Sequence, residues 1–358
     1  MFKDKKIKFK FESKYIDSVF VFEDGDFILF GVNASSCANN NNIKKGYNSI
    51  IFDGKTFKPK GGLEISSSSS YYNLKDNEFV LCQGYSSFIV YQFNSDRTSQ
   101  KKIQNLNSGD FGTGRYLIQI SNGDLCLLKM HTGYNGLYVY RKNPEVNEKF
   151  EPYGNTFLYQ LEDINDIVDL NEKEVLGVQK KYGGIDSLVL NIIDTSNYKI
   201  LRKNEIKYKD DSNNRLYISL PFHKWGENKL IGGGADSIFI FGLDTLELET
   251  TISFDKNIKN ILVRPKGNIF LYLVADEKSK EMNLYKEANC YSLFYYLNEA
   301  KIDFKKNELK SYKEELINDY CKAHEDLFFI YNYVNNGLIT LTDKTEIIIY
   351  DDFGDSNE

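Results

Sequence analysis

The residues best suited to acid–base or metal chemistry are few in this chain and far apart in the sequence. The three histidines are His131, His223 and His324, and each lies in a different part of the chain. A histidine-rich metal site or a histidine-based catalytic centre needs these side chains within reach of one another. We therefore predict no metal site and no catalytic residues of this kind.

Other sequence signals for catalysis are also weak. Residues 109–115 are glycine-rich, but they lack the lysine and the strand-to-helix setting of a phosphate-binding loop, so we predict no cofactor. Most Asp and Glu residues fall in turns, where local hydrogen bonding accounts for them. A facing pair of acids for glycoside chemistry could still come from distant segments of the chain. We predict a protein that is not an enzyme, with an enzyme or a sugar-binding protein as the open alternative.

The cysteines and the N-terminus indicate a reducing compartment. The chain has five cysteines, an odd number without a Cys-x-x-Cys pair, and Cys82 and Cys126 lie in apolar runs. Buried free thiols in the cytoplasm are the economical interpretation. Residues 1–6 lead into alternating Lys and apolar residues, which predicts no signal peptide. No window approaches 18 apolar residues, so we predict no membrane span.

The charge balance argues against nucleic acid as a partner. Lys and Arg number 45 against 51 Asp and Glu, for a formal net charge of −6. Nucleic-acid binders usually carry a basic face or stripe, and none stands out here. A protein or peptide is the more natural partner, and the oligomeric state is left open.

The chain is organised by a repeat. Seven segments each combine an apolar strand, a tight polar turn and a second apolar strand, and pairs such as Asp24-Gly25 and Asn122-Gly123 suit hairpin turns. A second hairpin follows each one, which makes a four-stranded unit of about 51 residues, near the known propeller periods. The sequence thus predicts an all-β, single-domain, seven-bladed β-propeller over residues 1–358. The expected blades are 15–65, 70–106, 114–160, 164–208, 215–254, 258–306, and 326–353 together with 6–12.

The two ends of the chain are expected to close the ring. The seventh unit has only three strands, and Ile7–Phe11 alternates apolar residues with Lys, as expected of an outer strand whose edge is guarded by charge. We predict that this segment completes the last blade. Residues 306–322 contain Leu309, Tyr312, Leu316 and Tyr320 at helical spacing, which predicts a helical insertion packed on its own domain.

The last unit resembles the WD-repeat propeller family. His324-Glu325-Asp326 precedes its first strand, and Asp343-Lys344-Thr345 precedes Ile347–Asp351. In that family a His, a turn Asp, a strand Ser or Thr and a strand Trp form a buried tetrad. The resemblance gives these parts to His324, Asp343, Thr340 or Thr342, and Tyr350. With three His and one Trp in the chain, most blades lack the tetrad, so the resemblance concerns architecture.

The longer connections are expected on one face of the propeller. Links from second to third strands and between blades carry most of the length variation, and such loops commonly hold binding residues. Gly-Tyr pairs at Tyr47, Tyr85 and Tyr134 would bring tyrosines near the central channel mouth, with Lys129 and His131 close by. They could form a docking surface, or they could be structural residues that recur with the repeat and pack between blades. We predict a non-catalytic scaffold that binds a protein or peptide on this face.

Overall fold

The computed structural model describes the backbone of the strands and many turns, and most side chains of these segments within residues 20–253. The described residues are 3–10, 18–22, 24–30, 48–56, 58–64, 70–83, 87–107, 113–131, 134–143, 149–153, 164–181, 187–207, 222–234, 237–253, 257–263, 270–277, 291–303, 308–322, 331–334, 337–343 and 346–351.

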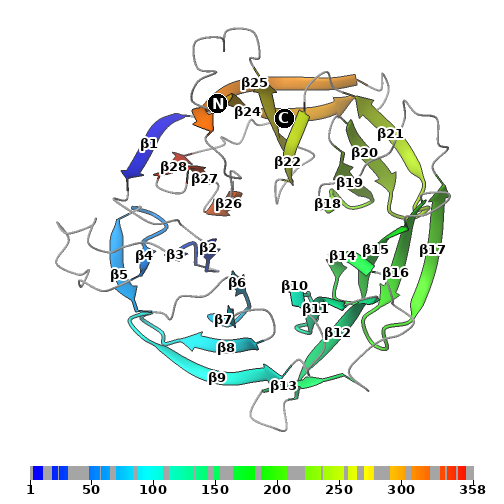
Figure 1. The fold of residues 1–358 in the computed structure, drawn as a ribbon, viewed down its shortest axis with the longest axis horizontal. Coiled ribbons are helices and arrows are strands. Elements are labelled where there is room, and N and C mark those ends of the chain that lie inside the picture. The colour runs from blue at the N-terminus through cyan, green and yellow to red at the C-terminus, as the bar shows by residue number, and fades with distance from the viewer. Residues whose placement is uncertain are drawn as a thin grey trace.

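Within these residues the strands pair into seven antiparallel four-stranded sheets. Figure 1 shows the sheets arranged as a ring. The strands nearest the ring axis are β2, β6, β10, β14, β18, β22 and β26. We number them as blades 1–7 in chain order. The all-β propeller predicted from the repeat is therefore confirmed.

The strand bounds of the first four blades are as follows. Blade 1 contains β2 (Ser18–Val21), β3 (Phe27–Phe30), β4 (Ser49–Phe52) and β5 (Pro59–Leu63). Blade 2 contains β6 (Ser70–Asn73), β7 (Glu78–Gln83), β8 (Ser87–Phe93) and β9 (Gln100–Asn107). Blade 3 contains β10 (Thr113–Gln119), β11 (Leu125–His131), β12 (Tyr134–Asn143) and β13 (Lys149–Pro152). Blade 4 contains β14 (Ile164–Asn171), β15 (Glu174–Lys181), β16 (Ser187–Asp194) and β17 (Ile200–Lys207).

The remaining blades follow the same order. Blade 5 contains β18 (His223–Trp225), β19 (Lys229–Gly233), β20 (Ser237–Gly242) and β21 (Leu248–Ser253). Blade 6 contains β22 (Asn257–Val263), β23 (Phe270–Glu277), β24 (Tyr291–Asp303) and β25 (Glu308–Lys322). Blade 7 contains β26 (Tyr331–Val334), β27 (Gly337–Asp343) and β28 (Glu346–Asp351), with β1 (Lys3–Lys10) as its outer strand.

The N-terminal strand pairs with the last blade, as its alternating pattern predicted. β1 runs antiparallel to β28, with Ile7 opposite Ile349 and Phe9 opposite Ile347. Each strand contributes backbone groups to the other, so neither leaves that edge unpaired.

The predicted helix at 306–322 is wrong, because residues Glu308–Lys322 form strand β25. β24 is a continuous strand of 13 residues, and β25 pairs with it from Tyr291 opposite Lys322 to Asp303 opposite Glu308. Without β25, this edge of β24 would present a long row of unpaired backbone groups. Sheet pairing thus overrides the helical spacing, and the predicted end of blade 6 moves from 306 to 322.

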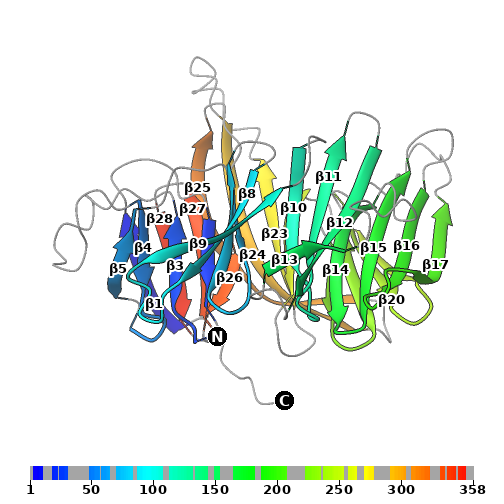
Figure 2. The same ribbon diagram turned by 90° about the horizontal axis from the view of Figure 1, so that it is seen from below.

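The two faces of the ring differ in their connections. We call the turn face the side that carries the turns from first to second and from third to fourth strands, and the loop face the opposite side. In Figure 2 β11 runs upward and β14 runs downward, so the loop face is at the top and the turn face at the bottom. Inner strands therefore start near the loop face and end at the turn face.

Buried apolar side chains join consecutive blades. One cluster combines Phe20, Phe22 and Phe30 of blade 1 with Phe79 and Phe93 of blade 2. Equivalent clusters join blades 2 and 3, 3 and 4, and 4 and 5. Hydrophobic burial at these seams, at about 25 cal/mol for each Å² removed from water, stabilises the ring. Cys82 and Cys126 are buried free thiols in these clusters, as predicted.

The tight turns on the turn face have the conformations that their sequences predicted. Gly25 and Gly123 have φ values of 88° and 92°, which glycine adopts without steric cost. Gly54, in the second turn of blade 1, lies against the first, and a Cβ there would come within 1.8 Å of the Gly25 carbonyl oxygen. Glycine at position 54 thus lets the two turns of the blade touch.

Candidate binding sites near the ring axis

Of the five predicted binding residues, the structure places three on neighbouring strands. His131 is opposite Tyr134, and Lys129 is opposite Gly136, at the loop-face end of blade 3. Only their backbone is described. Tyr47 and Tyr85 lie outside the described residues, so the proposed ring of tyrosines stays a prediction.

The predicted tetrad of the last blade is described only in its backbone. Asp343 is opposite Glu346 at one end of the β27–β28 pair, and Tyr350 is opposite Leu338 near the other. Thr340 lies between these positions, opposite Ile348. His324 lies outside the described residues, and the tetrad itself stays a prediction.

A set of interacting polar side chains lies on the loop-face half of the strands of blades 3 and 4. Asp166 of inner strand β14 accepts hydrogen bonds from the backbone N–H groups of Ile167 (2.9 Å) and Phe222 (3.1 Å). Lys180 of β15 has its backbone N–H 2.5 Å from Oδ1 of Asn165. Tyr116 of β10 is 39% exposed, one of the few large hydrophobic residues among the described side chains that face water. We call Tyr116, Asp166 and Lys180 the loop-side cluster.

The members of the loop-side cluster affect one another's titration. Burial raises the pKa of Asp166, although the two backbone donors and Lys180 oppose this shift. Burial lowers the pKa of Lys180, and the charge of Asp166 opposes that change. Although Tyr116 is 39% exposed, desolvation by the surrounding protein, together with the charges of Asp166 and Tyr72, raises its pKa to about 12. Perturbed groups from two neighbouring blades at one place are typical of functional sites.

On the turn face, charged side chains mainly connect blades. Arg97, in the last turn of blade 2, places Nη1 2.7 Å from Asp26 and 2.9 Å from Asp24 of blade 1. Its guanidinium also stacks over the Phe22 ring at 3.8 Å from the centroid. Lys60 of β5 adds a second cation 2.6 Å from Asp26. This is a structural bridge rather than an open charged site, because each group already has its counter-ion.

A similar bridge joins blades 3 and 4. The Tyr198 hydroxyl donates to Asp124 at 2.6 Å, and Arg141 Nη2 lies 2.7 Å from the same carboxylate. Arg141 also donates to the Thr195 carbonyl at 2.9 Å and stacks on Tyr153. Asp124 is 2% exposed, so these partners replace the hydration that its carboxylate loses on burial.

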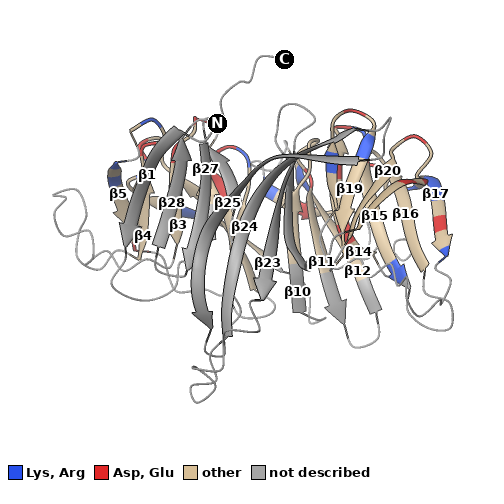
Figure 3. Ribbon diagram, turned by 90° about the horizontal axis from the view of Figure 1, so that it is seen from above, with Lys and Arg blue, Asp and Glu red and all other residues tan. Residues whose placement is uncertain are grey.

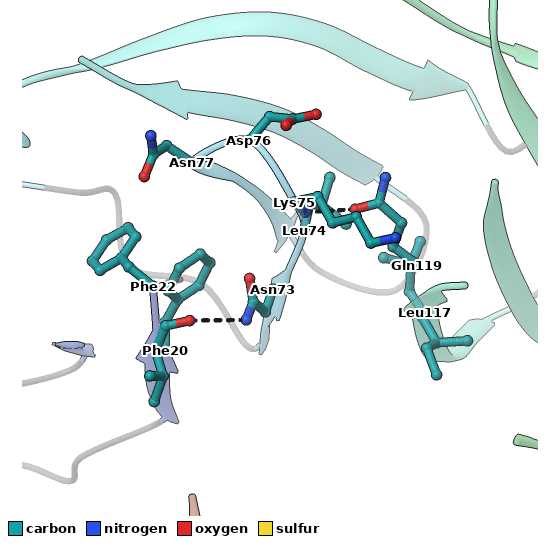
Figure 4. A pocket seen from close by; sticks show the side chains of 11 residues that line it. Phe20, Phe22, Asn73, Leu74, Lys75, Asp76, Asn77, Leu117 and Gln119 are labelled. Atoms are coloured by element: carbon teal, nitrogen blue, oxygen red, sulfur yellow. Dashed lines mark hydrogen bonds between the residues drawn. The ribbon is translucent and has the colours of Figure 1, made fainter. Parts of the chain in front are cut away.

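A cavity of about 380 Å³ lies between the turn-face ends of the inner strands of blades 1–3. Figure 4 shows its aromatic wall of Phe20 and Phe22 and, opposite, a polar wall that includes Lys75 and Gln119. Gln119 Oε1 accepts from the Lys75 backbone N–H at 2.6 Å, and Lys75 Nζ donates to the Ser121 carbonyl at 2.8 Å. Its polar groups therefore hold blades 2 and 3 together.

A second cavity of about 500 Å³ lies between the turns of blades 3 and 4. Its wall carries both signs of charge, including Arg141, Lys142 and Lys173 against Asp124 and Glu172. Among the described residues no group of three or more His, Cys, Asp or Glu side chains could hold a metal ion. In the same part of the chain, no helix is long and apolar enough to cross a membrane.

Comparison with solved structures gives the fold. A chain in the structure titled "Crystal Structure of Mitotic Checkpoint Complex" matches with a TM-score of 0.58 at 9% identity, covering 99% of this chain and 94% of that one. Sqt1 from Saccharomyces cerevisiae matches with a TM-score of 0.50 at 8% identity, covering 96% and 97%. Both matches are below 25% identity, and they show the β-propeller fold. No family model and no curated protein sequence matches the chain.

The sequence prediction missed the loop-side cluster of this propeller. Its members come from β10, β14 and β15, so no local motif connects them. One signal was present in Ile164–Leu170, where Asn165, Asp166 and Asp169 lie among apolar residues of a strand that the fold places next to the axis. A charged residue inside an inner strand is costly to bury, and that cost could have marked the position.

Proposed function

We propose that this protein is a non-catalytic scaffold that binds a protein or peptide on its loop face, at the mouth of the propeller axis. The observation that carries the proposal is the loop-side cluster, in which the partly exposed Tyr116 and the Lys180 ammonium group each interact electrostatically with the same carboxylate, Asp166. An amphipathic aromatic ring with charged neighbours is a common composition of protein-binding hot spots. The β-propeller fold is compatible with such a role.

The turn face supports this function less well. Its cavity walls consist of side chains that already bond between blades, such as Lys75 and Gln119. A ligand there would have to replace these bonds rather than add new ones. We extend the proposed surface to Lys129, His131 and Tyr134, whose backbone lies at the loop-face end of blade 3, and to Tyr47 and Tyr85.

Comparative affinity purification tests the proposal. Wild-type protein and the variants Tyr116→Ala and Lys75→Ala are used as baits in extract of the source cells, and the recovered proteins are compared. Lys75 is the matched control because it is also exposed but lies on the turn face. A partner retained by Lys75→Ala and lost by Tyr116→Ala supports the loop face. A partner lost only by Lys75→Ala contradicts it.

The raised pKa of Asp166 favours a second candidate function, a propeller hydrolase acting on a sugar. A carboxyl group with a raised pKa can act as a general acid, and a second carboxylate would complete the pair. A screen of chromogenic glycosides separates the two functions. Hydrolysis by the wild type that Asp166→Asn abolishes would establish the enzyme, whereas a scaffold gives no turnover with either protein.

The scaffold proposal includes a closed ring of seven blades forming one domain, without a cofactor, in the cytoplasm. The seven described sheets and the pairing of β1 with β28 support the closed ring. The buried free thiols of Cys82 and Cys126 are compatible with a reducing compartment. We expect a single cooperative unfolding transition, and two separate transitions would contradict the single domain. We also expect a fusion of this protein to a fluorescent protein to be seen in the cytoplasm.

A further inference from the structure

The outer strand of blade 4 leaves apolar side chains in water. Among the described strands, β17 pairs with β16 on one side only, and its other edge is at the rim of the ring (Figure 1). Ile200 and Leu201 are 37% and 53% exposed, and with Tyr116 they are the exposed large hydrophobic residues of the described segments. Single exposed apolar residues are common, but two neighbours at a free strand edge are a recognised pairing hazard.

Two other described outer strands limit such pairing. β5 begins at Pro59 and β13 ends at Pro152, and proline cannot donate a backbone hydrogen bond to an added strand. β9 is as long as β17 and has no proline, but Leu106 is buried and Ile103 is half-buried. β17 therefore combines length, absence of proline and exposed apolar side chains.

The backbone of β17 is regular and well anchored. Arg202–Lys207 is in unbroken register with Ser187–Ile192, and the register shift that bypasses Leu201 is confined to the end of the strand. Arg202 Nη1 donates to the Asp244 carbonyl of blade 5 at 2.6 Å, and Asn204 Nδ2 donates to the Leu246 carbonyl at 3.0 Å. The free edge is thus held in an extended conformation before any partner binds, which reduces the entropy lost on binding.

The charge of β17 is opposite to that of the whole chain. Arg202, Lys203 and Lys207 are exposed, whereas the one carboxylate, Glu205, accepts a hydrogen bond from Ser187 of its own blade at 3.0 Å. Figure 3 shows the basic positions along β17 at the edge of the ring. A second copy of the chain is a poor occupant, because antiparallel pairing of two β17 strands would bring cations against cations.

We propose that the free edge of β17 binds an extended acidic segment of a partner protein by strand addition. Main-chain hydrogen bonds to Arg202–Lys207 would supply affinity, and the lysine and arginine side chains would select Asp and Glu. Ile200 and Leu201 would cover an apolar residue at one end of the segment. This edge is separate from the loop face, so either site can fail its test without the other.

A peptide titration tests the charge preference. The probes are two short capped peptides, one alternating glutamate with valine and the other alternating lysine with valine. We expect the acidic probe to bind the full-length protein and the variant Lys203→Glu with Lys207→Glu to weaken it about tenfold or more. The matched control is Lys101→Glu with Lys102→Glu in β9, which also replaces two exposed rim lysines and should leave binding unchanged.

Several results would overturn the proposal. One is a loss of acidic-probe affinity in the β9 control equal to that in the β17 variant. The others are stronger binding of the basic probe than of the acidic probe, and no binding of the acidic probe at about 1 mM. Sedimentation showing a dimer that the β17 variant dissolves would identify a second copy as the occupant instead. Melting temperatures of both variants verify that they are folded.

Methylated peptides test the strand geometry independently. Two methylated versions of the acidic probe are made, one with the odd-numbered and one with the even-numbered backbone nitrogens methylated. Both are needed because an added strand directs every second N–H at its partner. At least one of the two should lose binding about tenfold or more. If both bind as well as the unmethylated probe, the acidic segment is held by its side chains alone and strand addition is wrong.

Discussion

The Tyr198 hydroxyl of blade 4 lies 2.6 Å from the buried Asp124 carboxylate of blade 3. In the same way, Arg97 Nη1 of blade 2 donates to the Asp26 carboxylate of blade 1 at 2.7 Å. Both donors belong to the turn between third and fourth strands, and both have positive φ, 56° and 59°. A side chain in this conformation is directed onto the preceding blade, so one turn geometry produces two inter-blade contacts with different chemistry.

Removing the Tyr198 hydroxyl should therefore destabilise the fold. In Tyr198→Phe, Asp124 loses a buried charge-assisted hydrogen bond, and we expect a loss of about 1.5–3 kcal/mol in the free energy of unfolding. Urea denaturation measures it. The control is Tyr153→Phe, whose hydroxyl donates to the Ser196 carbonyl in an exposed contact, and which should change stability by less than about 0.5 kcal/mol. Equal stability of Tyr198→Phe and the wild type would show that the contact contributes nothing.

The contribution of Arg97 to the free energy of unfolding should depend on pH. Burial raises the pKa of Asp24, but the hydrogen bond from Arg97 and its positive charge outweigh this and hold the pKa below its usual value. A lowered folded-state pKa gives stability that is present above the unfolded value near 3.9 and is lost as pH falls through the folded value. We expect the stability difference between wild type and Arg97→Met to shrink below about pH 4. A difference that is unchanged from neutral to acid pH would contradict this mechanism.

The hairpins and the pairing of the chain ends could be predicted from sequence because they depend on local patterns. Asn122-Gly123 specifies a turn by itself, and the alternation in β1 indicates an edge strand. β25 could not be predicted in this way, because Leu309, Tyr312, Leu316 and Tyr320 satisfy helical spacing by coincidence, and only the edge of β24 decides between the two structures. The bridges at Arg97 and Tyr198 join residues 71 and 74 positions apart, so they depend on the ring.

Deleting residues 1–12 should severely destabilise the protein. The deletion removes β1 and exposes the edge of β28, whose Ile347 and Ile349 positions pair with it. We expect a loss of more than about 4 kcal/mol, or failure to fold, as for other lesions that break a structural network. Thermal unfolding followed by circular dichroism measures the effect. Deletion of residues after Asp351, where β28 ends, is the control, and an equal melting temperature for both truncations would refute closure through β1.

Binding of a protein partner at the loop face beside Tyr116 is tested by isothermal titration of the purified partner against wild type, Tyr116→Ala and Lys75→Ala, with melting temperatures recorded for all three. We expect Tyr116→Ala to raise the Kd about tenfold or more, a loss of about 1.4 kcal/mol, and Lys75→Ala to leave it unchanged. If Lys75→Ala weakens binding and Tyr116→Ala does not, the partner binds the turn face and the proposed site is wrong.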